Sequence, residues 1–174
     1  MIALAIDGFE LRVPCKVAHF RSSSAAAVCG VTLDLDDVAA RKGYLQLVEA
    51  LAIGAEFAPL SAKRRKNQHG LVAETYASGR GGRLVAWRQA DTGELDGFEL
   101  RVEDWCWQGA VARAGLKIER VAGAKAARTA ASEESRRLFR WIVLNLPRSV
   151  PSDLHELLAK FAHDRGDWRA PPPI

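Results

Sequence analysis

The chain has 174 residues, of which 48% are apolar and 26% are charged, with a net charge of +4. This balance is typical of one globular domain, or of two small ones sharing a core, and it excludes a generally disordered chain. No apolar run approaches the roughly 20 residues that a bilayer-spanning helix needs, so we expect no membrane span.

The N-terminus and the cysteines predict a cytoplasmic protein with reduced thiols. The first ten residues lack the basic start and long apolar core of a signal peptide. Cys15, Cys29 and Cys106 are odd in number and far apart, which disfavours a disulfide framework. No pair has CxxC spacing, so we expect neither a structural zinc ion nor any other metal.

Charge is unevenly divided along the chain. Residues 1–60 contain 5 Lys and Arg against 7 Asp and Glu, whereas residues 61–174 contain 20 against 14, so the sections carry −2 and +6. The basic section fits attraction to nucleic acid, to a nucleotide phosphate or to an acidic protein. A solvated basic surface with no ligand explains it equally well.

The first section reads as strand, strand, helix. Residues 6–20 read as one strand, in which apolar and polar side chains alternate up to Val13, with an edge or bulge at Pro14. A second strand covers residues 25–35, and its expected core residues are Val28, Val31, Leu33 and Leu35. A helix follows, capped by an aspartate of the cluster Asp34, Asp36 and Asp37 and stopped near Gly54. Its expected core residues are Val38, Tyr44, Leu45, Val48, Leu51 and Ala52.

Short strands dominate the second section. Residues 61–70 form a polar, basic junction, and strands are predicted at 71–78, 82–89 and 95–102, with one or two more within 105–121. Residues 122–131 are small and basic and predict an exposed connector.

Two helices follow the connector. The first begins after Ser132 and is broadly apolar, which predicts burial. In the second, Asp153 and Glu156 fit a capping box. Its apolar residues recur at i, i+3, i+4 and i+7, namely Leu154, Leu157, Leu158 and Phe161.

The heptapeptide DGFELRV occurs twice, at residues 7–13 and 96–102. Each copy is followed by a further strand and then by a helix with an acidic start. Two related units therefore explain the pattern, although local convergence of amphipathic strands also produces such matches. We predict an α+β fold of two antiparallel β-sheet or barrel units, each with a helix, the first copy shortened, plus an extra C-terminal helix. The predicted divisions are residues 1–60, 61–148 and 149–174.

The order of elements also resembles a known family. Residues 7–57, with the strand VCGVTLDL and the helix segment YLQLVEALAIG, look like the C-terminal half of a PilZ domain, and residues 63–146 look like a fuller copy. The resemblance implies a regulatory role and cyclic di-GMP binding through an RxxxR segment and a [DN]xSxxG turn.

The dinucleotide motif is incomplete in this chain. In YASGRG, Ser78 and Gly81 keep the spacing of the turn, but Tyr76 replaces the acidic or amide residue. Arg64 and Arg65 precede it without an arginine four positions later. The resemblance therefore predicts a degenerate unit, with cyclic di-GMP as its possible ligand and no other cofactor. The candidate ligand-binding residues are Arg64, Arg65, Ser78, Arg80 and Arg83.

Two other features have a functional and a structural interpretation. The basic turn at residues 79–83 fits either phosphate binding through backbone N–H groups or an ordinary hairpin connection. Trp87, Trp105 and Trp107 fit either an exposed surface for a partner or a base, or core packing. Strand alternation places Trp105 and Trp107 on one face and Cys106 on the other.

No pattern pairs a nucleophile or base with an orienting group, so we expect no enzyme. Three functions by binding remain open. The first is a regulatory or adaptor protein that acts through a protein partner, and the second is a single-stranded nucleic-acid-binding module that uses the basic section and its tryptophans. The third is an immunity or inhibitor protein that neutralises a toxin.

Overall fold

The computed structural model describes residues 1–6, 9–24, 26–61, 69–113, 115–122, 125–128 and 133–163. These residues form three helices and antiparallel sheets, and the last element among them is a helix, which confirms the predicted α+β class and the C-terminal helix. The chain forms two compact units, Met1–Glu49 and Ala50–Ile174. These bounds differ from the predicted ones at residues 60 and 148, because the division falls inside helix α1 (Val38–Ala55).

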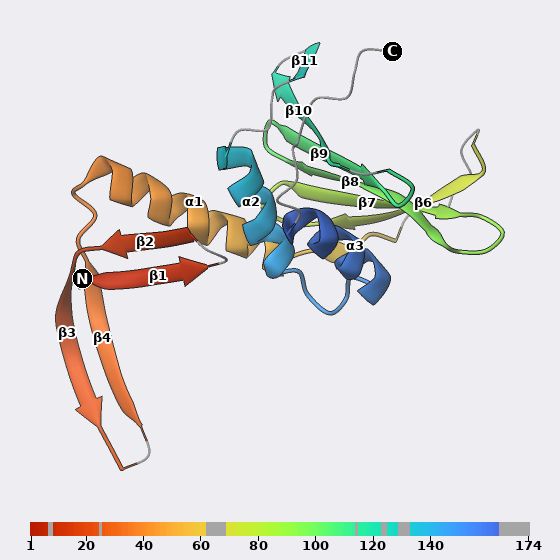
Figure 1. Cartoon of the computed structure of the whole chain (residues 1–174). Helices are drawn as coiled ribbons and strands as arrows, with labels where there is room; N and C mark the ends of the chain where they lie inside the picture. Colours follow the sequence, from red (N-terminus) through yellow and green to blue (C-terminus); the bar gives the residue numbers. More distant parts are fainter. Residues whose placement is uncertain are drawn as a thin grey trace. The chain divides into compact units, whose positions relative to one another are not determined.

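The first unit contains two separate two-stranded sheets (Figure 1). Strand β1 (Ile2–Ile6) pairs with β2 (Phe9–Val13), and β3 (Cys15–Ser22) pairs with β4 (Ala27–Leu33). Both pairings are antiparallel, and the β3–β4 register shifts between Val17 and His19. Within the described residues, therefore, every strand of this unit has a neighbour on one side only.

Helix α1 starts at the predicted aspartates, because the Asp37 carboxylate accepts a hydrogen bond of 2.7 Å from the Ala40 amide. The predicted core face of the helix is wrong in part. Val38, Leu45 and Val48 are 76%, 54% and 43% exposed, and the buried residues are instead Leu47, Ala50 and Ile53. Apolar residues surround most of this helix, so their spacing does not single out one buried stripe.

The second unit is built on one seven-stranded antiparallel sheet whose strands follow one another in sequence order. Its strands are β5 (Ala58–Pro59), β6 (Leu71–Ala77), β7 (Gly82–Gln89), β8 (Leu95–Val102), β9 (Trp105–Ala110), β10 (Lys117–Ala122) and β11 (Lys125–Arg128). Strand β11 corrects the predicted connector at residues 122–131. Backbone pairing with β10 forms this strand although alanine has a low strand propensity.

Helices α2 (Glu133–Leu144) and α3 (Ser152–His163) lie side by side against one face of this sheet (Figure 1). The ring of Phe98 on β8 lies 6.1 Å from that of Phe139 on α2 and 5.6 Å from that of Phe161 on α3. Trp107 on β9 adds a contact of 5.7 Å to Phe139. These aromatic rings form the centre of the core.

The two copies of DGFELRV have different surroundings. Residues Phe98–Val102 belong to β8, which pairs with β7 on one side and β9 on the other. Residues Phe9–Val13 form β2, which pairs only with β1 within the described residues. The FELRV part of each copy is a strand, as predicted, and the origin of the copies by duplication stays a prediction.

Candidate functional site

The turn between β6 and β7 holds two of the residues predicted to bind a ligand. The Ser78 amide donates to the Gly82 carbonyl at 2.9 Å, and Gly81 takes a φ of +88°, which glycine adopts without strain. Arg80 Nε donates to Glu56 Oε1 at 2.8 Å, and the Ser78 hydroxyl lies 3.5 Å from the other carboxylate oxygen. Glu56 therefore binds both Ser78 and Arg80 within the chain.

Arg83 follows the same turn but does not bond Glu56 within the described residues. It is the second residue of β7, directly opposite Arg101 on β8, and both side chains are exposed. Arg101 Nε bonds Glu99 Oε1 at 2.7 Å, whereas no ion pair of Arg83 occurs within the described part of the chain. Arg64 and Arg65 lie outside the described residues. The structure thus brings Ser78 and Arg80 together on Glu56, whereas Arg83 lies opposite Ala77 in the β6–β7 pair.

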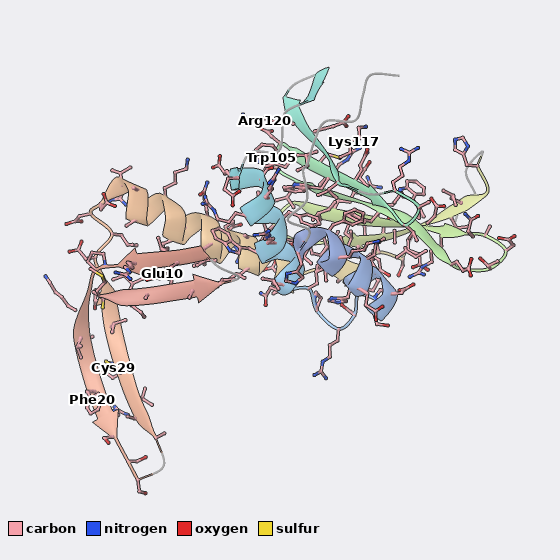
Figure 2. All side chains as sticks on the ribbon, viewed as in Figure 1. Glu10, Phe20, Cys29, Trp105, Lys117 and Arg120 are labelled. Atoms are coloured by element: carbon pink, nitrogen blue, oxygen red, sulfur yellow. The ribbon has the colours of Figure 1, made fainter. Side chains whose placement is uncertain are left out.

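The three tryptophans do not form one surface. Trp107 is fully buried at 0% exposure, which corrects its assignment to a partner or stacking surface. Trp105 lies on the same face, with its ring 6.2 Å from that of Trp107 and the Arg120 guanidinium 5.5 Å above it (Figure 2). Trp87 is half-buried and stands opposite Gly97 in the sheet. Strand alternation places it on the other face from the core.

The sheet face away from α2 and α3 carries a polar network around a buried thiol. Cys106 is 2% exposed, and burial raises its pKa, with a further rise from the Glu99 carboxylate. Gln108 Nε2 donates to Glu99 Oε2 at 2.7 Å, and Lys117 Nζ donates to Gln108 Oε1 at 3.2 Å. Because these polar groups bond one another and a raised pKa keeps the thiol neutral, Cys106 is not an activated nucleophile.

The first unit contains a surface that sequence analysis missed. Strands β3 and β4 form a hairpin, here called the β3–β4 ribbon, on which Val17, Phe20 and Val28 are 66%, 64% and 58% exposed. Figure 2 shows Phe20 on this ribbon. The exposure of Val28 also corrects its prediction as a core residue. Residues 15–22 lack the alternation of apolar and polar side chains that marks a strand with one buried face. This missing alternation was the sequence signal for an exposed ribbon.

Burial in this unit is sparse. Among its described side chains, only Val13 and Leu47 are buried hydrophobic residues, at 0% and 2% exposure. The second unit, by contrast, buries a continuous aromatic and aliphatic core. Residues 1–49 therefore expose apolar surface and strand edges together.

The described residues contain no group of three or more His, Cys, Asp or Glu side chains arranged to hold a metal ion. None of the helices in the described ranges is long and apolar enough to cross a bilayer. Comparison with known proteins adds no assignment, since no family model, no curated protein and no solved structure matches this chain.

Proposed function

We propose that this chain is a non-enzymatic regulatory or adaptor protein that binds a partner protein through the β3–β4 ribbon. One observation carries the proposal. The ribbon combines the exposed apolar side chains Val17, Phe20 and Val28 with strand edges that have no neighbour within the described residues.

A two-stranded ribbon of this kind has little stability on its own. Isolated hairpins are marginally stable in water, and unpaired edges readily accept another strand. A partner that supplies a strand gains main-chain hydrogen bonds, and apolar pockets beside it would take Val17 or Phe20. Partner binding therefore satisfies both features of the ribbon at once.

The ribbon offers few of the contacts that bind nucleic acids. Nucleic-acid affinity comes mainly from Lys and Arg side chains that neutralise phosphates. The ribbon has two such side chains, Lys16 and Arg21, both on β3, and none on β4, while residues 1–60 as a whole carry a net charge of −2. The aromatic surface proposed for stacking also loses Trp107, which is buried in the core.

The β6–β7 turn supports a regulatory unit without dinucleotide binding. A phosphate ligand at this turn would have to displace Glu56 from Ser78 and Arg80. It would also meet the negative charge of that carboxylate at close range. These contacts support the PilZ-like unit as a degenerate one, so we expect no thermal shift with cyclic di-GMP.

The decisive experiment is affinity capture of partners from source-cell extract, treated with nuclease, on three forms of the full chain. The first is the wild type. The second carries Val17→Thr, Phe20→Thr and Val28→Thr, which remove apolar surface from the ribbon but keep its strand propensity. The third, a matched control, carries Val111→Thr and Leu144→Thr at positions 50% and 47% exposed in the second unit.

A specific protein recovered with the wild type and the control, and lost with the ribbon variant, is the expected result. Purified partner should then bind the purified wild type with a Kd at least about tenfold lower than that of the ribbon variant. Equal binding to all three forms would refute the role of the ribbon. A captured toxin inhibited by this chain would identify the immunity class, and nuclease-sensitive capture would favour the nucleic-acid alternative.

A further inference from the structure

We propose that two copies of this chain associate through antiparallel pairing of β2 with the β2 strand of the second copy. The two β1–β2 hairpins would then form one four-stranded sheet, related by a two-fold axis through Leu11. This dimer uses β2 rather than the β3–β4 ribbon, so it stands apart from the proposed partner binding.

The sequence of β2 is self-complementary in that arrangement. Around Leu11, an antiparallel pair places Glu10 of each copy opposite Arg12 of the other. A shift by two residues places Glu10 opposite Glu10, or Arg12 opposite Arg12. A shift by one places apolar side chains opposite charged ones and turns the apolar face outward. Parallel pairing opposes like charges in register and, when shifted by two residues, forms a single Glu10–Arg12 pair. The antiparallel register centred on Leu11 forms two such pairs and keeps the apolar side chains on one face.

Glu10 and Arg12 of β2 have no charged residue opposite them on β1. On the β1 side, Glu10 lies opposite Ala5 and Arg12 lies opposite Ala3, so β1 gives neither charge a cross-strand partner. Within the strand, Arg12 Nε lies 2.5 Å from Glu10 Oε1, and the two side chains are 68% and 47% exposed. Glu10 is labelled in Figure 2. Two cross-copy ion pairs would therefore replace contacts that now lie in water.

The second copy of the heptapeptide shows how the same residues behave with a strand on each side. Glu99 and Arg101 on β8 form the same intrastrand pair, at 2.7 Å. Glu99 also accepts a hydrogen bond of 2.7 Å from Gln108 on the adjacent strand β9. The sequence FELRV thus fits a central strand, and its acidic residue takes a cross-strand partner there.

Pairing also completes an otherwise minimal sheet. The apolar face of the β1–β2 hairpin contains Leu4 and Leu11, of which Leu11 is only half-buried and Leu4 is paired with it. Leu11 reaches α1, where a Cβ built on Gly43 would lie 3.2 Å from Leu11 Cδ1. A two-stranded hairpin is stabilised by further strands or by packing against a helix. Pairing between two copies would add strands to the contact that Leu11 already makes with α1.

The test is sedimentation equilibrium of the full chain over a concentration series, with charge reversals in β2. Glu10→Arg and Arg12→Glu each place like charges opposite each other twice in the dimer. Each variant alone should raise the dimer Kd roughly ten- to a hundredfold. Mixing the two variants in equal amounts should restore the wild-type Kd. In the mixed dimer, the two arginines on β2 of one chain face the two glutamates on β2 of the other.

Mixing separates pairing between chains from effects within one chain. Neither variant contains an opposite-charge pair inside its own β2, so recovery requires contact between chains. Starting from +4, the variants have net charges of +6 and +2, so overall attraction does not explain recovery. Lys16→Glu, a reversal at an exposed β3 position, is the matched control and should leave the Kd unchanged.

A wild-type chain that stays monomeric up to several hundred micromolar would overturn the dimer. A dimer Kd that neither charge reversal changes would also overturn it. So would a mixture of the two variants whose Kd stays above the wild-type value, provided that circular dichroism shows normal folding of both variants. The ribbon variant with threonine at 17, 20 and 28 should dimerise like the wild type. Loss of dimerisation in the charge variants with normal partner capture would support the dimer and the proposed function independently. Equal partner capture by the ribbon variant, with normal dimerisation, would refute the proposed function alone.

Discussion

Arg88 on β7 and Asp153 in the first turn of α3 form a paired contact across 65 positions of sequence. Nη1 and Nη2 of Arg88 donate to the two carboxylate oxygens at 2.5 and 3.0 Å, and Nε donates to Glu74 at 2.8 Å. The Arg88 side chain is only 14% exposed, so its charge is compensated where water is scarce. The pair fixes the start of α3 to the sheet.

Asp153→Asn should lower the free energy of unfolding by about 1 kcal/mol. The effect is modest because Asp153 is about half exposed and Arg88 keeps its bond to Glu74. Urea unfolding followed by tryptophan fluorescence measures the loss. Asp104→Asn, at an exposed turn between β8 and β9, is the matched control and should change stability by less than about 0.5 kcal/mol.

The same carboxylate predicts a pH dependence. Its hydrogen bond to Arg88 lowers the pKa of Asp153 in the folded chain below its ordinary value. A group with a lowered folded pKa stabilises fully above its unfolded pKa, and that contribution disappears as pH falls through the folded value. The stability gap between wild type and Asp153→Asn should therefore be constant from about pH 5 to 7 and shrink below about pH 4. A gap that widens in acid would contradict this assignment.

Two glycines of α1 should respond to alanine with opposite signs. A Cβ on Gly54 would lie 2.4 Å from the Ile142 carbonyl oxygen, so backbone must move. Gly54→Ala should cost about 1 to 3 kcal/mol despite the better helix propensity of alanine. At Gly43 the nearest atom is the Leu11 side chain at 3.2 Å, which can shift, so Gly43→Ala should be neutral or stabilise by up to about 1 kcal/mol. Thermal unfolding of both variants tests the contrast.

Sequence patterns correctly predicted the helices and strands in which buried apolar residues recur at regular spacing. Leu154, Leu157, Leu158 and Phe161 are all buried, as the helical spacing predicts, and the strands of residues 71–102 follow alternation and turn residues. Asp153 shows the limit of local reasoning. Its spacing to Glu156 suggested a capping box, but the side chain accepts from the Leu154 amide and binds Arg88, a distant residue in sequence.

The candidate sites depended on contacts that no local pattern encodes. Glu56 lies 22 and 24 positions before Ser78 and Arg80, so nothing in the turn sequence indicates that its polar groups are already bound. The β3–β4 ribbon was missed because neither of its faces is buried, which removes the periodic signal. Apolar residues on such a strand are informative only once their exposure is known.

The three thiols should differ sharply in reactivity. Cys29 is exposed on β4, Cys15 is half-buried and Cys106 is buried with a raised pKa. Thiolate is the reactive form, so Cys106 should stay unmodified by a thiol reagent at about pH 8 until the chain unfolds. Cys29→Ser should abolish the fastest phase of labelling, and mass spectrometry of the labelled peptides identifies each site. Rapid native labelling of Cys106 would contradict its burial.

Amide hydrogen exchange offers an internal comparison within one molecule. The two DGFELRV segments have the same residues, so the intrinsic exchange rates of their shared positions match and any difference reports structure. Phe98–Val102 lies between two strands and beneath helices, and it should exchange only on global unfolding. In dilute monomer, Phe9–Val13 should exchange at least about a hundredfold faster, because one edge of β2 lacks a neighbour among the described residues. Raising the concentration should slow exchange in Phe9–Val13 and leave Phe98–Val102 unchanged. Equal protection of both segments in dilute monomer would show that another part of this chain already covers β2.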